Sequence, residues 1–419
     1  MPLNVLIVGA GVAGPALAIF LQGSNPSYNI TVLERAPSLR TAGQQIDFKN
    51  QAVDVMKKMG ILEAVKSLCV HEIGSEIVDS NGKGVASFGI TPAGQQGRGL
   101  TSEYEIMRGD LVNLLYETSL KQNEKVKQLG KEGGLVYEFG KSLEDLAQDD
   151  NGVDVTFSDG QKRRYDIVVA ADGYGSRTRR LAFGQEANDE AFKSTGVHAA
   201  YYSIPRIEGE GGVAKIYNAH GRRLIVLRPS DRPVTQVLLF TMAEEEKLKK
   251  CYKESVEKQK EAFAEIFKDA GWQSDRLLKG LKTCTDLYVN ELAQIKMKQL
   301  HTGRVVLLGD AGYCPTPFTG MGTLGCFVGA YVLAGELARH GNNVSKAFSA
   351  YNETIKTPVE ELQKLPSLLG VFLPSSRVGV WILRNLMWAA SKFEPLIPRS
   401  QGEDPKRWKL PEYPELNLK

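Results

Sequence analysis

The chain opens with a short apolar run at residues 4–8 that leads into the glycine-rich segment Gly9-Ala10-Gly11-Val12-Ala13-Gly14. Small and apolar residues at 15–22 then predict a helix, and a second apolar run at 30–33 ends at Glu34. A buried strand, a glycine turn, a helix and another buried strand make a βαβ unit. Glu34 follows the last glycine by about twenty positions, where an acidic side chain reaches the ribose in dinucleotide-binding units.

Two later apolar runs end in similar turns. The run at 165–171 leads into Asp172-Gly173, and the run at 304–308 leads into Gly309-Asp310. Ligands of open parallel sheets bind beyond the carboxyl ends of the strands. We therefore expect three strand ends, scattered over most of the chain, to converge on one ligand, which requires interleaved domains.

The pattern of residues changes between 192 and 242, where apolar and polar positions alternate with the period of strands. Residues 244–269 have apolar positions at helical spacing, which predicts helices that cover the new sheet. The predicted fold class is α/β, with a Rossmann-type dinucleotide-binding domain interleaved with a β-sheet substrate domain and followed by C-terminal helices. The expected boundaries are 1–180 and 281–350 for the dinucleotide-binding domain, 181–280 for the substrate domain, to which an excursion near 72–100 is added, and 351–419 for the helices.

Composition narrows the class of protein. With 52 basic and 49 acidic residues among 419, and no basic stripe interleaved with aromatics, nucleic-acid binding is disfavoured. Five scattered cysteines and five scattered histidines give no metal site and no disulfide framework. The first residues lack the features of a signal peptide. A reducing, cytoplasmic location is expected.

The apolar stretch at 365–390 is interrupted by Pro366, Pro374, Arg377 and Arg384. It therefore lacks the roughly 18 to 20 apolar residues that a transmembrane helix requires. For residues 378–390 we expect an amphipathic helix that covers the protein's own core. A helix lying at a lipid interface is the alternative that the sequence leaves open.

The glycine segment favours a dinucleotide, although a purely structural βαβ unit is the alternative. Gly9 permits a tight turn, Gly11 lets a pyrophosphate approach the backbone, and Gly14 allows close helix packing. No second strand-coupled segment of this kind is present. Instead, Asp310 at a strand end can accept from polyol hydroxyls, and the glycine-rich start of a helix at about 323–338 can lie against a flat ring. This combination suits FAD, so the Rossmann-type domain at 1–180 and 281–350 is expected to be an FAD-binding domain.

Four motifs carry a resemblance to a known family. The sequence resembles the class A, PHBH-like FAD-dependent monooxygenases, and within them the branch of tetracycline-inactivating monooxygenases and secondary-metabolite hydroxylases. The motifs are Gly9 to Gly14 with Glu34-Arg35, Met107 to Leu111, Ala171 to Arg179, and Gly309 to Gly322.

The resemblance implies roles for individual residues around a non-covalent FAD. Contacts to the pyrophosphate and ribose fall on Gly9, Gly11, Gly14, Glu34, Arg35 and Arg108. A ribityl contact falls on Asp310, a flavin-side contact on Asp47, a nucleotide motif on Asp172, and ring-side contacts on Pro317, Gly320 and Gly322. Arg40 is the candidate for transient NADPH. Tyr313 and Leu324 stand where the family commonly has His and Asn, so side-chain contacts from those two positions are not expected.

The same resemblance implies the reaction. NADPH or NADH reduces the flavin, O2 adds to form a flavin C4a-hydroperoxide, and a phenolic, polycyclic or enone-type small molecule is hydroxylated, epoxidised or rearranged. A flavin reductase or dehydrogenase on the same fold, and a flavin-binding protein without turnover, are the alternatives. The sequence does not indicate an oligomeric state.

Substrate contacts are expected from the β-rich region. Lys215 and Tyr217 share one face of a predicted strand, where a cation and a phenol could assist deprotonation of an acidic substrate. A solvated Lys215 and a packed Tyr217 are the alternative. Candidates for an apolar pocket wall are Phe240, Met242, Phe318 and Thr319, with His198, Tyr201 and Tyr202 as weaker candidates.

Overall fold

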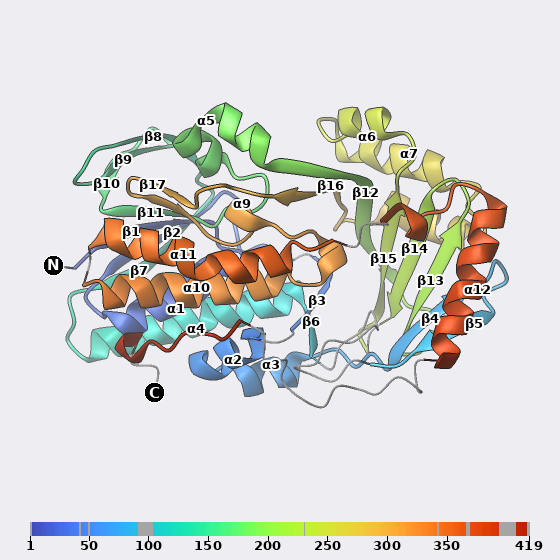
Figure 1. Ribbon diagram of the computed structural model, residues 1–419, viewed down its shortest axis with the longest axis horizontal. Coiled ribbons are helices and arrows are strands. Elements are labelled where there is room, and N and C mark those ends of the chain that lie inside the picture. Colours follow the sequence, from blue (N-terminus) through green and yellow to red (C-terminus); the bar gives the residue numbers. More distant parts are fainter. Residues whose placement is uncertain are drawn as a thin grey trace.

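The computed structural model describes residues 2–41, 43–48, 51–90, 104–229, 231–341, 343–365, 369–393 and 408–416. Two parts lie side by side in Figure 1, each built on its own β-sheet. The N-terminal strand belongs to the first part, and the chain passes between the two parts several times.

A six-stranded sheet with the order β17-β18-β11-β1-β2-β7 forms the centre of the first part. Its neighbouring strands are parallel except for the pair β17 and β18. Apolar runs such as IVVA in β11 are buried at every residue, because both faces of the sheet are covered. The strands are β1 (Asn4–Val8), β2 (Asn29–Glu34), β7 (Gly134–Phe139), β11 (Ile167–Ala170), β17 (His301–Thr302) and β18 (Val305–Leu307).

Helices cover one face of this sheet, and a small antiparallel sheet covers the other. The helices that pack together on the first face are α1 (Ala13–Ser24), α4 (Arg108–Gln128), α10 (Gly322–Arg339) and α11 (Val344–Leu362). The antiparallel sheet on the second face consists of β8 (Leu143–Gln148), β9 (Val153–Phe157) and β10 (Lys162–Tyr165).

The second part is built on a seven-stranded sheet with the order β16-β12-β15-β14-β13-β4-β5. The strands are β4 (Gly74–Val78), β5 (Gly84–Phe88), β12 (Phe192–Pro205), β13 (Val213–Ala219), β14 (Arg223–Pro229), β15 (Val234–Thr241) and β16 (Tyr288–Ile295). One face of the sheet packs against α6 (Glu245–Cys251), α7 (Val256–Phe267) and α8 (Ser274–Thr283).

The other elements are a short ribbon and several helices and turns outside the two main sheets. A two-stranded ribbon is formed by β3 (Gln45–Asp47) and β6 (Glu105–Met107). The remaining elements are α2 (Gln51–Met59), α3 (Leu62–Leu68), α5 (Arg177–Ala191), α9 (Asp310–Tyr313), the 3-10 turns η1 (Pro317–Thr319), η2 (Leu369–Phe372) and η4 (Pro414–Leu416), and α12 (Arg377–Phe393).

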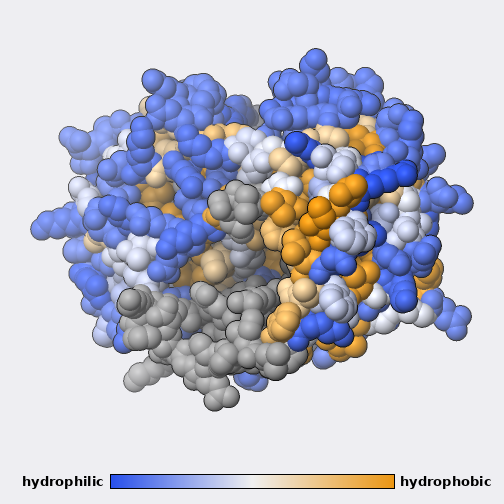
Figure 2. Space-filling view, turned by 45° about the vertical axis from the view of Figure 1, so that its right-hand side comes forward, coloured by the Kyte–Doolittle hydropathy of each residue, from blue (hydrophilic) through white to orange (hydrophobic). Residues whose placement is uncertain are grey.

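The structure places the excursion near residue 72 in the second sheet, since β4 and β5 are its last two strands. It also extends that sheet beyond the expected boundary at 280, because β16 pairs with β12. The C-terminal helices pack on different parts of the molecule: α11 packs on α10, whereas α12 packs on β5 and β13. Hydrophobic side chains gather on the face of the molecule that carries α12 (Figure 2). Within the described ranges, no helix is both long enough and apolar enough to cross a bilayer.

Candidate functional site

Three strand ends meet at one edge of the six-stranded sheet. Val8 lies in register with Ala170, and Ala170 lies in register with Leu307. The backbone continues this ladder past the strands, since the Ala171 N–H donates to the Val8 carbonyl at 2.8 Å. The turns that start at Gly9, Asp172 and Gly309 are therefore neighbours. The expected convergence of three distant segments is confirmed.

The glycine loop after β1 leaves no room for side chains at two positions. Gly9 has φ of 114°, and a Cβ there would lie 2.4 Å from the Ala171 carbonyl oxygen. A Cβ on Gly14 would lie 2.0 Å from the Gly9 carbonyl oxygen. At Gly11 the nearest atom is the Arg108 guanidinium at 3.5 Å, so this side of the loop is open. Within the part of the chain that the structure describes, no side chain caps the N-terminus of α1, where N–H groups and the helix dipole favour an anion.

Charged side chains border this loop. The Glu34 carboxylate accepts from the Ala10 N–H at 3.1 Å and from the Ala36 N–H at 2.9 Å, which fixes it at the end of β2. The Arg108 side chain is half-buried and donates to the Arg40 carbonyl at 3.4 Å. Burial and the nearby Arg40 charge lower the pKa of Arg108. Arg35 and Arg40 are exposed.

Asp310 begins α9 at the end of β18 and is half-buried. Burial raises the pKa of its carboxyl group to about 6, while the hydrogen bond from Cys314 and the charge of Arg108 lower it. A carboxylate in this position can accept hydroxyl donors from a polyol, and such hydrogen bonds would favour its charged form. The arrangement fits the ribityl chain of FAD.

Asp172 takes part in a local network. Its carboxylate accepts from the Ser176 hydroxyl at 2.5 Å and from the Thr178 N–H at 3.1 Å. Ser176 in turn caps α5 by accepting from the Arg179 N–H at 2.9 Å. The Asp172 side chain therefore shapes the start of α5, and its contact with a nucleotide stays a prediction.

Arg179 links two of the strand-end turns. Its buried guanidinium donates to the Ala311 carbonyl at 2.7 Å, to the Tyr174 carbonyl at 2.8 Å and to the Asn188 side-chain oxygen at 3.0 Å. The sequence places Arg179 in a motif without assigning it a role. The structure shows that it holds the turn after β11 against the turn after β18.

The ring-side loop, residues 317–322, contains η1 and leads into α10. Gly320 has φ of 62°. Among the described residues, no atom lies within 4 Å of the position that a Cβ on Gly322 would take, and no side chain caps the N-terminus of α10. Pro317 is exposed. The Thr319 hydroxyl donates to the Thr316 carbonyl at 3.1 Å and accepts from the Met321 N–H at 3.3 Å, so it stabilises the loop itself.

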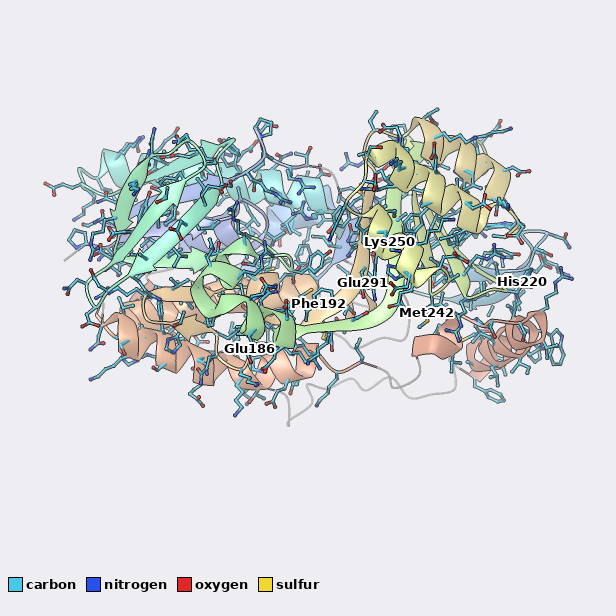
Figure 3. All side chains as sticks on the ribbon, turned by 90° about the horizontal axis from the view of Figure 1, so that it is seen from above. Glu186, Phe192, His220, Met242, Lys250 and Glu291 are labelled. Carbon is cyan, nitrogen blue, oxygen red and sulfur yellow. The ribbon has the colours of Figure 1, made fainter. Side chains whose placement is uncertain are left out.

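One face of the seven-stranded sheet meets this loop. We call it the inner face, and its members pair in register across neighbouring strands. They include Ala199, Tyr201, Ile216, Val226, Leu238 and Phe240. The Phe240 ring lies 5.7 Å from the Phe318 ring of η1, measured between centroids. Met242 and Phe318 also pack against this apolar cluster. Figure 3 shows β12 running from Phe192 into this sheet.

Two tyrosines lie on this side, of which the sequence indicates Tyr201 only as a weak candidate and Tyr288 not at all. Tyr201 is buried, and its hydroxyl has no hydrogen-bond partner among the described residues. Its ring lies 5.9 Å from the Phe240 ring and 6.1 Å from the Tyr288 ring. Tyr288 lies near the charges of Arg108 and Asp310, and burial raises its pKa. Neither lies in a glycine motif, and only strand alternation could have indicated Tyr201.

Lys215, Tyr217 and Tyr202 lie on the opposite face, which α6, α7 and α8 cover. Tyr217 donates to the Ala270 carbonyl at 2.9 Å, Tyr202 donates to the Leu277 carbonyl at 3.0 Å, and Lys215 pairs with Glu76. The structure therefore places these three side chains away from the inner face and the ring-side loop, and their contact with a substrate stays untested. Lys215 and Tyr217 do share a face, but it is the helix-covered face, because successive side chains alternate along a strand.

A buried ionic cluster joins the loop at 43–47 to the second sheet. Arg228 of β14 contacts both Glu72 and Glu105, and the Gln45 side chain donates to Glu72 at 3.1 Å. Gln236 of β15 accepts from the Gln45 N–H at 2.9 Å. Burial raises the pKa of Glu105 to about 7, opposed by Arg228. The cluster fixes the loop that carries Asp47, which lies opposite Glu105 in the ribbon.

The two departures from the family pattern are part of the core. Tyr313 is buried, and its hydroxyl lies 3.0 Å from the Tyr351 hydroxyl. Leu324 is also buried, and both residues belong to the hydrophobic core of the first part of the molecule. Both side chains therefore take part in core packing. The described residues contain no group of His, Cys, Asp and Glu that could hold a metal.

Comparison with known proteins gives consistent matches over the whole chain. The family described as FAD binding domain matches residues 2–361. The FAD-dependent monooxygenase asL6 of Sarocladium schorii is 40% identical over all of both chains. The monooxygenase CTB7 of Cercospora beticola is 30% identical, covering 98% of this chain and 97% of its own. The crystal structure of tetracycline destructase Tet(51) matches with a TM-score of 0.76 and 27% identity, covering 96% of this chain and all of that chain.

Proposed function

The chain belongs to the FAD binding domain family and is an FAD-dependent monooxygenase, and on that premise we propose that it uses NADPH or NADH and O2 to oxidise a phenolic, polycyclic or enone-type small molecule. The product gains one oxygen atom by hydroxylation, epoxidation or oxidative rearrangement. The resemblance to a tetracycline destructase supports a polycyclic substrate, and the apolar inner face supports a largely hydrophobic one.

The contact between Phe318 and Phe240 carries the proposal. It sets the loop at the N-terminus of α10 directly against the inner face of the second sheet. Bound FAD supplies the redox chemistry, since it accepts a hydride from the nicotinamide cofactor and activates O2. The protein then positions the substrate and excludes water, for which an apolar wall of Phe240, Leu238 and Val226 is suited.

The strand-end geometry supports the first of the cofactor contacts that we propose. The open side of Gly11 and the uncapped start of α1 receive the pyrophosphate, beside the Arg108 guanidinium. Glu34 accepts from the ribose and Asp310 from the ribityl chain. Further contacts are assigned to Arg35, Asp47, Asp172, Pro317, Gly320 and Gly322, and a transient NADPH contact to Arg40. FAD is held without a covalent bond, so denaturation should release it intact.

Tyr201 provides the polar contact in the substrate pocket. Its buried hydroxyl, without a partner among the described residues, can donate to a phenolate or carbonyl oxygen of the substrate. A single donor on an apolar wall orients a ring while the wall supplies contact area.

A screen of phenols and polyketides for stimulated NADPH oxidation tests the proposal. We expect a stimulating compound to yield a product heavier by one oxygen atom, with label from ¹⁸O₂. NADPH oxidation that produces only hydrogen peroxide or a reduced organic product with every compound would indicate a reductase and contradict the proposal.

Two matched variants locate the pocket. Phe240→Leu should raise the KM for the compound found about tenfold or uncouple NADPH oxidation from product, because it opens the wall at Phe318. Phe267→Leu removes similar packing on the helix-covered side. It should lower the melting temperature while leaving KM and coupling unchanged.

A further inference from the structure

Helix α12 has apolar side chains on two opposite sides. At 100° per residue, Val380, Leu383 and Met387 form an inner stripe. The outer stripe consists of Val378, Trp381, Ile382, Leu386, Trp388 and Phe393. A helix that only covers the protein's own core needs one such stripe, so the outer stripe requires another explanation.

The inner stripe and the segment before it fix the helix in place. Val380 and Leu383 are buried, and Met387 packs against the inner face of the second sheet. The backbone carbonyl of Pro374 accepts from the Arg222 N–H at 3.0 Å, and Arg384 donates to the Asn218 carbonyl at 3.2 Å. The outer stripe is therefore presented by a firmly packed helix.

The outer stripe is exposed to an unusual degree for side chains of this size. Val378 is 67% exposed, Trp381 is 66% exposed and Trp388 is 50% exposed. Phe372 of η2 adds another exposed aromatic ring just before the helix. Contiguous apolar patches of this kind mark an interaction surface.

The charges of α12 decide between possible occupants. Residues 377–393 contain three basic residues and no acidic residue, and Arg377 and Lys392 are exposed at its two ends. In a symmetric dimer through this stripe, basic residues would meet basic residues in either helix direction. A surface of anionic headgroups complements both ends, and tryptophan rings favour the headgroup region.

We propose that α12 docks the protein on an anionic lipid surface, lying in the plane of the headgroups with its outer stripe inserted and Arg377 and Lys392 on the phosphates. This inference does not depend on the proposed function. Because the inner stripe packs on the sheet face that meets η1, docking would also set the proposed substrate pocket close to the lipid, where apolar small molecules partition.

Vesicle co-sedimentation of the full-length, FAD-loaded protein tests the inference. We expect binding to vesicles of phosphatidylcholine with phosphatidylserine, weaker binding to phosphatidylcholine alone, and loss of binding as salt is added. The double variant Trp381→Ser/Trp388→Ser should lose about tenfold or more in affinity. Arg377→Gln/Lys392→Gln should lose the preference for phosphatidylserine. Leu129→Ser is the matched control. Leu129 is also a highly exposed apolar residue, but it lies at the C-terminal end of α4, so this variant should bind as the unchanged protein does.

Because the substituted side chains are exposed, all variants should keep bound FAD and their melting temperatures, which separates docking from folding. Absence of binding by the unchanged protein, or equal binding by the tryptophan variant, would overturn the proposal. A tryptophan-dependent dimer in light scattering would instead assign the stripe to a second copy. Tryptophans shielded from acrylamide in the lipid-free monomer would show that the chain's own residues cover the stripe.

Discussion

The two sheets of this protein carry their functional residues in different ways. At the edge of the six-stranded sheet, the site consists mostly of backbone, because Gly9, Gly11 and Gly14 matter for the side chains that they lack. On the seven-stranded sheet, the site depends on which way a side chain points. Phe240 faces the ring-side loop, whereas Tyr217, two strands away, faces the covering helices.

This difference explains why one site can be recognised from sequence and the other cannot. A glycine whose Cβ would overlap a carbonyl must be a glycine, so the requirement appears as a fixed letter at a fixed spacing. An inward-pointing residue on a strand covered on both faces leaves no such mark. A shift by a single residue exchanges the two faces completely.

The largest effect is expected where the backbone is most crowded. In Gly14→Ala, the added Cβ would lie 2.0 Å from the Gly9 carbonyl oxygen, so the loop and α1 must separate. We expect FAD affinity to fall more than 100-fold, together with a lower melting temperature. Flavin absorbance after gel filtration and a melting curve of the apoprotein measure the two effects.

Gly11→Ala separates ligand binding from folding. Among the described residues, its Cβ meets the Arg108 guanidinium alone, at an ordinary contact distance of 3.5 Å, so the apoprotein should melt as the unchanged protein does. FAD affinity should still fall, by about tenfold, because the methyl group occupies the approach of the pyrophosphate. If this variant binds FAD normally, the pyrophosphate does not lie on this loop.

A pH-dependent effect of similar size is expected at Asp310. Asp310→Asn should weaken FAD binding about tenfold, because it removes a charged acceptor of hydroxyl hydrogen bonds. Isothermal titration of the apoprotein with FAD measures the loss. An unchanged affinity would contradict the assignment of Asp310 to the ribityl chain.

The same variant should stabilise the apoprotein at neutral pH. The pKa of Asp310 in the folded chain is raised to about 6 from 3.8, so the folded state holds its proton more tightly than the unfolded state. The contribution of this group to stability therefore decreases as pH rises from 3.8 through 6. We expect the asparagine variant to melt above the unchanged apoprotein at pH 7, and the gap to close near pH 4.

Prediction from sequence succeeded where local chemistry determines geometry. The βαβ unit, the strand ends at Asp172 and Asp310, and the helix after Gly322 could all be placed, because each depends on residues that are close in the chain. Arg179 and Tyr288 could not, since their partners are brought together only by the interleaved topology. The sequence also does not show what the outer stripe of α12 contacts, because hydrophobic spacing does not reveal what covers a helix.

The smallest and most discriminating effects are expected from two tyrosines on opposite faces of the seven-stranded sheet. Tyr217→Phe removes a hydrogen bond to the Ala270 carbonyl and should lower the free energy of unfolding by about 1 kcal/mol without changing substrate kinetics. Tyr201→Phe removes a buried hydroxyl that has no partner among the described residues, so stability should stay equal or rise slightly.

The kinetic result should be reversed between the two variants. If Tyr201 donates to the substrate oxygen, Tyr201→Phe should raise KM or uncoupling severalfold, up to about tenfold for a loss of about 1.4 kcal/mol, while Tyr217→Phe keeps both values. Denaturant unfolding and steady-state NADPH oxidation with product analysis measure the pair. A kinetic loss in Tyr217→Phe with none in Tyr201→Phe would show that the substrate lies on the helix-covered face, and the comparison of faces drawn from Phe240 and Phe318 would then be wrong.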